Sequence, residues 1–155
     1  LEENDRDHLF LGDSLSWGPK ATLTHLARLL SRRRSKFNPL WNDLVVGGWD
    51  EQEQKIVLGT TDMIGTMYEE KVIATGMGMH LALPILRAGW RPDLTEPEAR
   101  QLVIQAMTVL LYRDCYTLNS ISIGIVKSDG TIRIEDPVQL KTEWTFNAFV
   151  RPPLA

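Results

Sequence analysis

Two stretches of the chain carry apolar residues at the three- and four-residue spacing of an amphipathic helix. The first follows Pro19, which suits an opening helical turn because that position needs no N–H donor. Its apolar stripe consists of Leu23, Leu26, Ala27 and Leu30. The second follows Thr95-x-x-Glu98, a capping box that marks a helix start. A shorter helix is expected at 79–88, although Pro84 disfavours a helix interior there.

Strand-like segments lie between and after these helices. The strands expected are 43–49, 55–61, 67–74, a stretch through Ile121, Ile123 and Ile125, and a stretch through Ile132 and Ile134. The polar linker 50–54 predicts a hairpin between the first two, Asp62 is expected to cap a strand-end turn, and 128–130 predicts a second turn. Grouped hairpins and grouped helices favour an α+β fold over a parallel βαβ sheet.

Composition and charge are those of one globular domain spanning residues 1–155, with 43% hydrophobic and 24% charged residues. The net charge of −3 and the absence of a long apolar run argue against nucleic acid and membrane partners. The basic run Arg32-Arg33-Arg34 with Lys36 complements the dipole at the end of the first helix, and binding of an acidic surface is its alternative interpretation. Cys115 is the single cysteine, so no intrachain disulfide forms.

The sequence offers no site for a cofactor or a metal ion. The three histidines, His8, His25 and His80, are scattered and none has a second ligand at helical spacing. Gly76-Met77-Gly78 looks like half of a dinucleotide-binding loop, but the third glycine of that motif would fall at Leu81. These glycines are therefore expected to serve a tight turn.

The segment Gly12-Asp13-Ser14-Leu15 resembles the nucleophile block of GDSL esterases, in which this serine attacks an ester. A serine nucleophile needs a histidine base and an orienting group, which that family places near its C-terminus. No histidine follows residue 80, and Asp5-x-x-His8 precedes the serine. A polar loop before the Pro19 helix is the simpler interpretation, and an esterase using Ser14 stays an alternative.

Several segments together resemble proteasome β-type subunits. They are Ser31 to Asn42 (SRRRSKFNPLWN), Val45 to Gly48 (VVGG), Gly65, Ala74 to Gly76 (ATG), Glu98 to Arg100 (EAR) and Tyr112 to Asp114 (YRD). The resemblance runs from about Leu9 to Trp144, and its strength lies in the agreement of order, spacing and expected elements.

This resemblance implies a four-layer αββα sandwich of the N-terminal-nucleophile hydrolase type, incomplete at the N-terminus. In active members an N-terminal threonine attacks the peptide carbonyl, with its own amine and a lysine supporting deprotonation. The chain begins at Leu1, so the family's first strands and first long helix are expected to precede it, together with any nucleophile. The chain would then be roughly the C-terminal two thirds of a β-type domain.

Two supporting motifs of active members are altered here. Active subunits carry Gly-Ser-Gly where this chain has Gly76-Met77-Gly78, and a thioether cannot donate the hydrogen bond of a hydroxyl. They carry Asp-x-x-Ser-Gly-Gly where this chain keeps Asp114, has Thr117 for the serine and lacks both glycines. A catalytic network short of two members fails as a unit, so Met77, Asp114 and Thr117 are expected to be degenerate positions with no catalytic role.

The function expected from the resemblance is that of a non-catalytic structural subunit of the 20S core particle, in ATP- and ubiquitin-dependent protein degradation. Its partners would be other α and β subunits in stacked rings, its location the cytoplasm and nucleus. A C-terminal tail, residues 147–155, would reach the opposite ring, and its prolines would lower the ordering cost. The alternatives are a catalytically active threonine peptidase subunit, the esterase, and an unrelated α+β binding domain.

Overall fold

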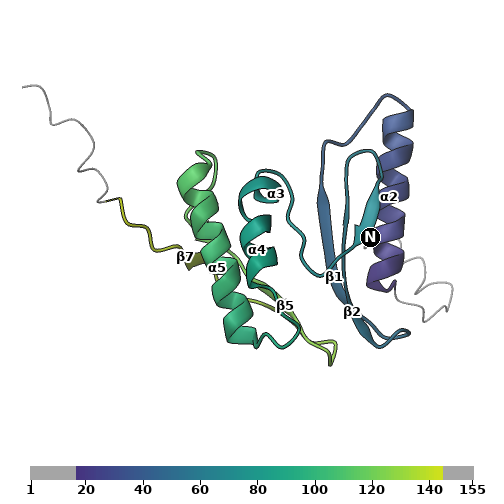
Figure 1. The fold of residues 1–155 in the computed structure, drawn as a ribbon. Helices are drawn as coiled ribbons and strands as arrows, with labels where there is room; N and C mark the ends of the chain where they lie inside the picture. The colour runs from purple at the N-terminus through teal and green to yellow at the C-terminus, as the bar shows by residue number, and fades with distance from the viewer. Residues whose placement is uncertain (1–16, 145–155) are drawn as a thin grey trace, which may run out of the picture.

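The computed structural model describes residues 17–144 (Figure 1). Its helices are α2 (Pro19–Ser35), α3 (Gly78–Leu81), α4 (Leu83–Gly89) and α5 (Glu96–Arg113). Its strands are β1 (Leu44–Asp50), β2 (Lys55–Thr61), β3 (Met67–Glu69), β4 (Ser120–Ile121), β5 (Gly124–Val126), β6 (Ile132–Ile134) and β7 (Val138–Gln139). The mixture of helices and antiparallel sheet confirms the α+β class, and the four-layer αββα sandwich stays a prediction.

The first half of the described chain is a three-stranded antiparallel sheet with α2 packed on one face (Figure 1). β1 and β2 form the predicted hairpin, in a register that pairs Leu44 with Thr61 and Asp50 with Lys55. Three residues of the predicted apolar stripe are buried, namely Leu23, Ala27 and Leu30. Val57 and Thr61 of β2 are buried as well. Burial of this stripe against the sheet is the main source of stability in this layer.

A tight turn joins β2 to β3 and lies against α2. The Asp62 carboxylate accepts hydrogen bonds from the backbone N–H groups of Ile64 (3.0 Å) and Thr66 (2.8 Å), which confirms its predicted capping role. Gly65 has a φ of 88°, and a Cβ placed there would lie 2.6 Å from the carbonyl oxygen of Ala27 in α2. Only glycine therefore allows this turn to approach the helix so closely.

The third strand is shorter than the predicted 67–74, because the chain leaves the sheet after residue 70. The Glu70 N–H still donates to the Leu58 carbonyl oxygen at 3.1 Å. The next residue, Lys71, places its ammonium group 4.7 Å from the ring centre of Trp90, at the end of α4. This cation–π contact links the segment to the helices instead of to β2.

The turn at Asp62 predicts a pH dependence of stability. Burial raises the pKa of the Asp62 carboxyl, but hydrogen bonds from Thr66, Ile64 and Gly65 together hold that pKa below its usual range. A carboxyl with a depressed folded-state pKa stabilises the protein above its unfolded pKa, and this stabilisation is lost as pH falls through the folded value. We expect Asp62→Asn to be less stable than wild type at pH 7, with the difference closing as pH falls below the ordinary pKa of an aspartate, about 4. Denaturant titrations across this range measure it, and a difference independent of pH contradicts the assignment.

The sequence pattern predicted one helix over 79–88, and the structure has two helices there, α3 and α4. Together with α5 they form the helical region. The chain breaks at Ala82, so that Pro84 falls in the first turn of α4, where its missing N–H leaves no hydrogen bond unmade. The predicted capping box opens α5: both the N–H and the hydroxyl of Thr95 donate to the Glu98 carboxylate, at 2.9 and 2.7 Å. α4 and α5 pack closely, since a Cβ on Gly89 would lie 2.4 Å from a Leu102 methyl carbon.

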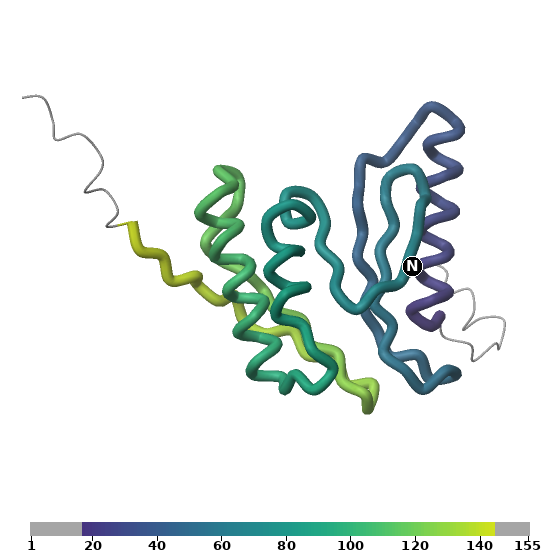
Figure 2. The backbone as a smooth tube through the Cα atoms, in the orientation of Figure 1, coloured from purple at the N-terminus to yellow at the C-terminus, as the bar shows by residue number. Residues whose placement is uncertain are grey.

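Two short antiparallel ladders complete the described chain, β4 with β7 and β5 with β6. The predicted strand through Ile121 to Ile125 is interrupted, with the buried Ile123 between β4 and β5. Its carbonyl oxygen accepts a hydrogen bond from the Glu135 N–H at 2.9 Å. The predicted turn at 128–130 is confirmed, with Gly130 at a φ of 80°. Figure 2 shows this hairpin extending along the helical region toward the end of the first sheet, and β5 contacts β1.

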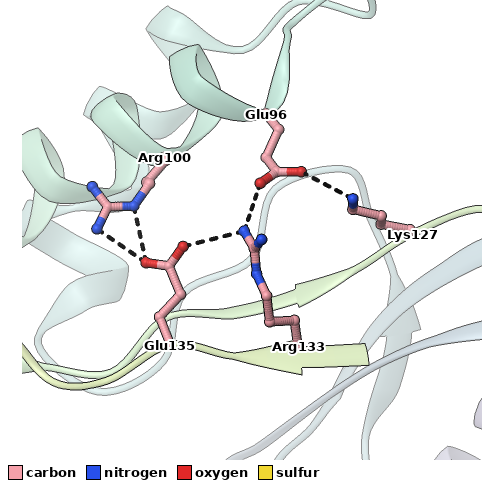
Figure 3. A network of polar contacts seen from close by, with 5 residues as sticks. All are labelled: Glu96, Arg100, Lys127, Arg133 and Glu135. Carbon is pink, nitrogen blue, oxygen red and sulfur yellow. Dashed lines mark hydrogen bonds and ion pairs between the residues drawn. The ribbon is translucent and has the colours of Figure 1, made fainter. Parts of the chain in front are cut away.

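A network of five charged side chains ties the β5–β6 hairpin to the start of α5 (Figure 3). Glu96 accepts a hydrogen bond from Arg133 at 2.7 Å and lies 3.8 Å from the Lys127 ammonium nitrogen. Glu135 lies between Arg100 (3.0 Å) and Arg133 (3.3 Å). The Arg100–Glu135 pair is the most shielded of these, with side chains 34% and 20% exposed, so it is the pair expected to contribute measurably.

Replacing Glu135 with glutamine tests this network. We expect a loss of about 1 kcal/mol in the free energy of unfolding at low salt, and a smaller loss at high salt, because two guanidinium groups lose their shared carboxylate. Asp93→Asn is the matched control, since Asp93 forms one ion pair with Arg91 and is 79% exposed. Urea titrations at two salt concentrations compare them. Equal effects of the two substitutions contradict a specific role for the network.

Candidate functional site

The positions singled out from the sequence lie on two loops. Residues 75–78 lead into α3, and residues 114–117 follow α5. α3 packs against α5, and Figure 1 shows α3 at the end of the helical region where α5 stops. The fold therefore brings the two loops to the same end of this region, although they are far apart in the sequence.

The first loop is a tight turn built by glycine. Gly76 has a φ of 58°, and the N–H groups of Gly78 and Met79 donate to the carbonyl oxygens of Thr75 and Gly76, each at 3.1 Å. Gly78 is buried, whereas Met77 is 50% exposed. Gly76 therefore serves the turn, as the sequence predicted, and the thioether of Met77 has no hydrogen to donate.

The second loop is closed on its own aspartate. One carboxylate oxygen of Asp114 accepts the backbone N–H of Tyr116 at 3.1 Å, and the other accepts the hydroxyl of Thr117 at 2.8 Å. The Thr117 N–H also donates to the Asp114 carbonyl oxygen, at 3.3 Å. Between them, Cys115 is exposed and Tyr116 is 90% exposed. Asp114 thus acts as a turn-forming residue at the end of α5.

The structure brings together two of the three predicted positions. Asp114 and Thr117 are hydrogen-bonded to each other, while among residues 17–144 no hydrogen bond joins Met77 to either of them. Both oxygens of the carboxylate and the hydroxyl proton are already engaged within the loop. The arrangement stabilises the loop that follows α5.

The histidines and Ser14, also considered as candidates in the sequence, lie outside these two segments of the chain. His25 packs edge-on against the Trp17 ring, with ring centres 4.8 Å apart, and His80 is exposed on α3. In the described part of the chain, no group of three or more His, Cys, Asp or Glu side chains could hold a metal ion. Ser14, His8 and the tail at 147–155 lie outside the described residues. The esterase alternative therefore stays untested.

A groove that the sequence reasoning missed lies between the start of α2, β1 and the β5–β6 turn. Its walls include Trp17, His25, Asp50 and Ile132. The buried Asp50 carboxylate accepts the N–H groups of Gln52 (2.9 Å) and Glu53 (3.0 Å), so it caps the β1–β2 turn. No sequence motif predicts this groove, because the residues that line it come from three separate segments of the chain.

At the rim of that groove, Glu53 has an unusual acidity. Hydrogen bonds from the ammonium groups of Lys20 and Lys55, together with their charges, lower the pKa of the Glu53 carboxyl to about 2. Its side chain is 41% exposed, and those of Lys20 and Lys55 are 50% and 45% exposed. Water therefore screens this triad, as it screens other surface ion pairs. Within the described residues, no helix is long and apolar enough to cross a membrane.

Comparison with known proteins decides the family. Residues 15–126 match the family model described as "Proteasome subunit", which covers most of the chain and both candidate loops. This chain belongs to the proteasome subunit family. The resemblance to β-type subunits is confirmed by curated relatives, which are named proteasome subunits of β type.

Several of these proteasome relatives, three of which follow, carry the name proteasome subunit beta type-4. The one from Arabidopsis thaliana is 42% identical over 94% of this chain and 60% of its own length. The one from Xenopus laevis is 41% identical, over 89% of this chain and 57% of its own length. The one from Dictyostelium discoideum is 41% identical, over 76% of this chain and 45% of its own length. This chain thus spans less than two thirds of the length of these proteasome relatives.

Proposed function

We propose that this chain is part of a non-catalytic, structural β-type subunit of the 20S proteasome core particle. The observation that carries the proposal is the state of the two loops, one before α3 and one after α5. Thr117 donates its hydroxyl proton to Asp114 within one turn, and Met77 offers a thioether where active members place a serine. Identity of about 40% to relatives named beta type-4 supports the same assignment.

The hydrogen bonds that these side chains make, or cannot make, disfavour a catalytic role. A supporting residue of a threonine nucleophile must hold a proton donor or acceptor ready near the reacting atoms. The Asp114 carboxylate accepts two hydrogen bonds from its own loop, and Met77 has no donor to give. These side chains therefore build the loops and leave the chemistry to other subunits.

The proposed partners are other α and β subunits in stacked rings, within ATP- and ubiquitin-dependent protein degradation in the cytoplasm and nucleus. Large apolar side chains that the described residues leave exposed agree with burial in an assembly. In the loop after α5, Tyr116 and Leu118 are 90% and 76% exposed.

The tail at 147–155 is proposed to reach the opposite ring, so that deleting 149–155 weakens ring pairing and leaves half-assembled particles. Native gels showing normal full particles would contradict the role of the tail.

Substitution in the assembled particle tests the non-catalytic role. Particles carrying Met77→Ala together with Thr117→Ala are expected to hydrolyse fluorogenic peptides at rates within twofold of the unsubstituted particle, per assembled particle. Thr108→Ala is the matched control, because its hydroxyl donates at 2.7 Å to the Ile104 carbonyl oxygen within α5, and the substitution also removes one hydroxyl. A tenfold loss of one peptidase activity in the double variant, with normal assembly and a silent control, would contradict the proposal.

A further inference from the structure

The end of α2 has an unusual cap. The N–H of Phe37 donates to the Arg34 carbonyl oxygen and the N–H of Asn38 to that of Arg33, each at 3.1 Å. This pair of bonds is the Schellman motif, whose left-handed position is usually glycine. Here that position is Phe37, with a φ of 52°. A large aromatic residue thus occupies a backbone conformation that L residues rarely adopt.

The side chain placed there contributes nothing to the core. Phe37 is 98% exposed, and Trp41, on the same connection to β1, is 78% exposed. Glycine at position 37 would relieve the backbone and remove an exposed apolar surface, so stability and solubility both argue against phenylalanine. Strained residues that persist without a structural gain cluster at functional surfaces.

The same connection carries uncompensated positive charge. Residues 31–42 contain four cations and no carboxylate, in a chain whose net charge is −3. Arg32, Arg34 and Lys36 are exposed, and within residues 17–144 none of them forms an ion pair. The Nε of Arg33 is shielded from solvent and has no hydrogen-bond acceptor among the described residues. We call Arg32, Arg34, Lys36, Phe37 and Trp41 the basic–aromatic patch.

We propose that the basic–aromatic patch docks on an acidic, apolar surface of a neighbouring subunit. This inference rests on the proposed function and names the chemistry of one contact within it. Arginine and aromatic side chains dominate the binding energy of protein interfaces, and cations select a partner that presents carboxylates. The patch lies at the end of α2 and on the connection to β1, on the side of the described chain away from α4 and α5 (Figure 2).

A protein surface fits the patch better than a nucleic acid does. Binding to a polyanion grows with the number of phosphates neutralised, and the net negative charge of the chain opposes it at long range. Two exposed aromatic rings beside three exposed cations instead match a partner with an apolar pocket and an acidic rim.

Charge reversal in the full-length subunit, produced together with its partner subunits, tests the inference. Arg32→Glu with Arg34→Glu is expected to lower incorporation into the particle at least tenfold, while the melting temperature of the full-length subunit falls by only about a few degrees from the lost charge–dipole interaction at the end of α2. The control is Arg87→Glu with Lys141→Glu, an equal change in charge at two other exposed cations. Control-level incorporation of the patch variant overturns this inference alone. Failure of the unsubstituted chain to enter any multi-subunit particle overturns the proposed function and this inference with it.

Labelling of the assembled particle identifies the partner surface. Lys36 is expected to react with an amine reagent at least tenfold more slowly in the particle than in the free chain. Zero-length carbodiimide coupling should then join Lys36 to an aspartate or glutamate of another subunit. Equal reactivity of Lys36 in both states overturns the inference. So does a patch variant that enters particles normally but loses salt-dependent affinity for a single-stranded oligonucleotide, because the partner is then nucleic acid.

Discussion

Replacing Gly65 with alanine is expected to lower the free energy of unfolding by about 3 kcal/mol or more. Two effects act together at this position. The φ of 88° is strained for any residue with a side chain, and the new Cβ would lie 2.6 Å from both the Ala27 carbonyl oxygen and the Ser31 Cβ. Rotation of a side chain cannot relieve these contacts, because they involve a backbone oxygen and a Cβ of α2. Urea denaturation followed by circular dichroism measures the loss.

Gly76→Ala separates the two effects. Gly76 also has a positive φ, of 58°, but a Cβ placed there would meet no atom within 4 Å. We expect it to lose only about 1 kcal/mol, the cost of a left-handed conformation. If the two alanine variants lose equal stability, the close approach of the β2–β3 turn to α2 is not what requires glycine at position 65.

The second large effect is expected at Leu30, which is 1% exposed between α2 and the sheet. Leu30→Ala removes buried methyl groups and leaves a cavity, so we expect a loss of about 3 kcal/mol in the free energy of unfolding. The preceding residue provides the control, since Leu29 is 38% exposed. Leu29→Ala is expected to lose less than about 1 kcal/mol. Similar losses at both positions would contradict the packing of α2 described above.

Much of the fold follows from local signals in the sequence. Proline at position 19 and the capping box at Thr95 and Glu98 mark the starts of the two long helices, and the structure begins both helices there. These signals work because the unpaired N–H groups of a first turn must be satisfied locally. The β1–β2 hairpin was equally predictable, because a polar linker separates two strand-like runs.

The predictions that were wrong concern the helix over 79–88 and the strand over 67–74, where contacts with residues distant in the sequence shape the chain. Pro84 was expected inside one helix, and the chain instead ends α3 and starts α4 so that the proline lies in a first turn. The third strand stops at Glu69, and Lys71 then contacts the ring of Trp90, which lies 19 residues further along the chain. Hydrophobic periodicity carries no information about such contacts.

The candidate positions came from the resemblance and not from any pattern of charge or spacing. The sequence could place Met77, Asp114 and Thr117 in two loops, and it could show that Met77 lacks a donor. It could not show that the Asp114 carboxylate accepts the Thr117 hydroxyl at 2.8 Å, since that depends on how the chain turns after α5. The groove beside Asp50 was missed because its walls come from three separate segments.

Native mass spectrometry of the complex that contains this chain, purified from cells that express it, is the most direct test of its proposed place in the core particle. A very large particle that also contains α- and β-type proteasome subunits is expected, with this chain released from it as one subunit among many. Recovery of the chain alone, or as a small oligomer of itself, would contradict the proposed role in the core particle.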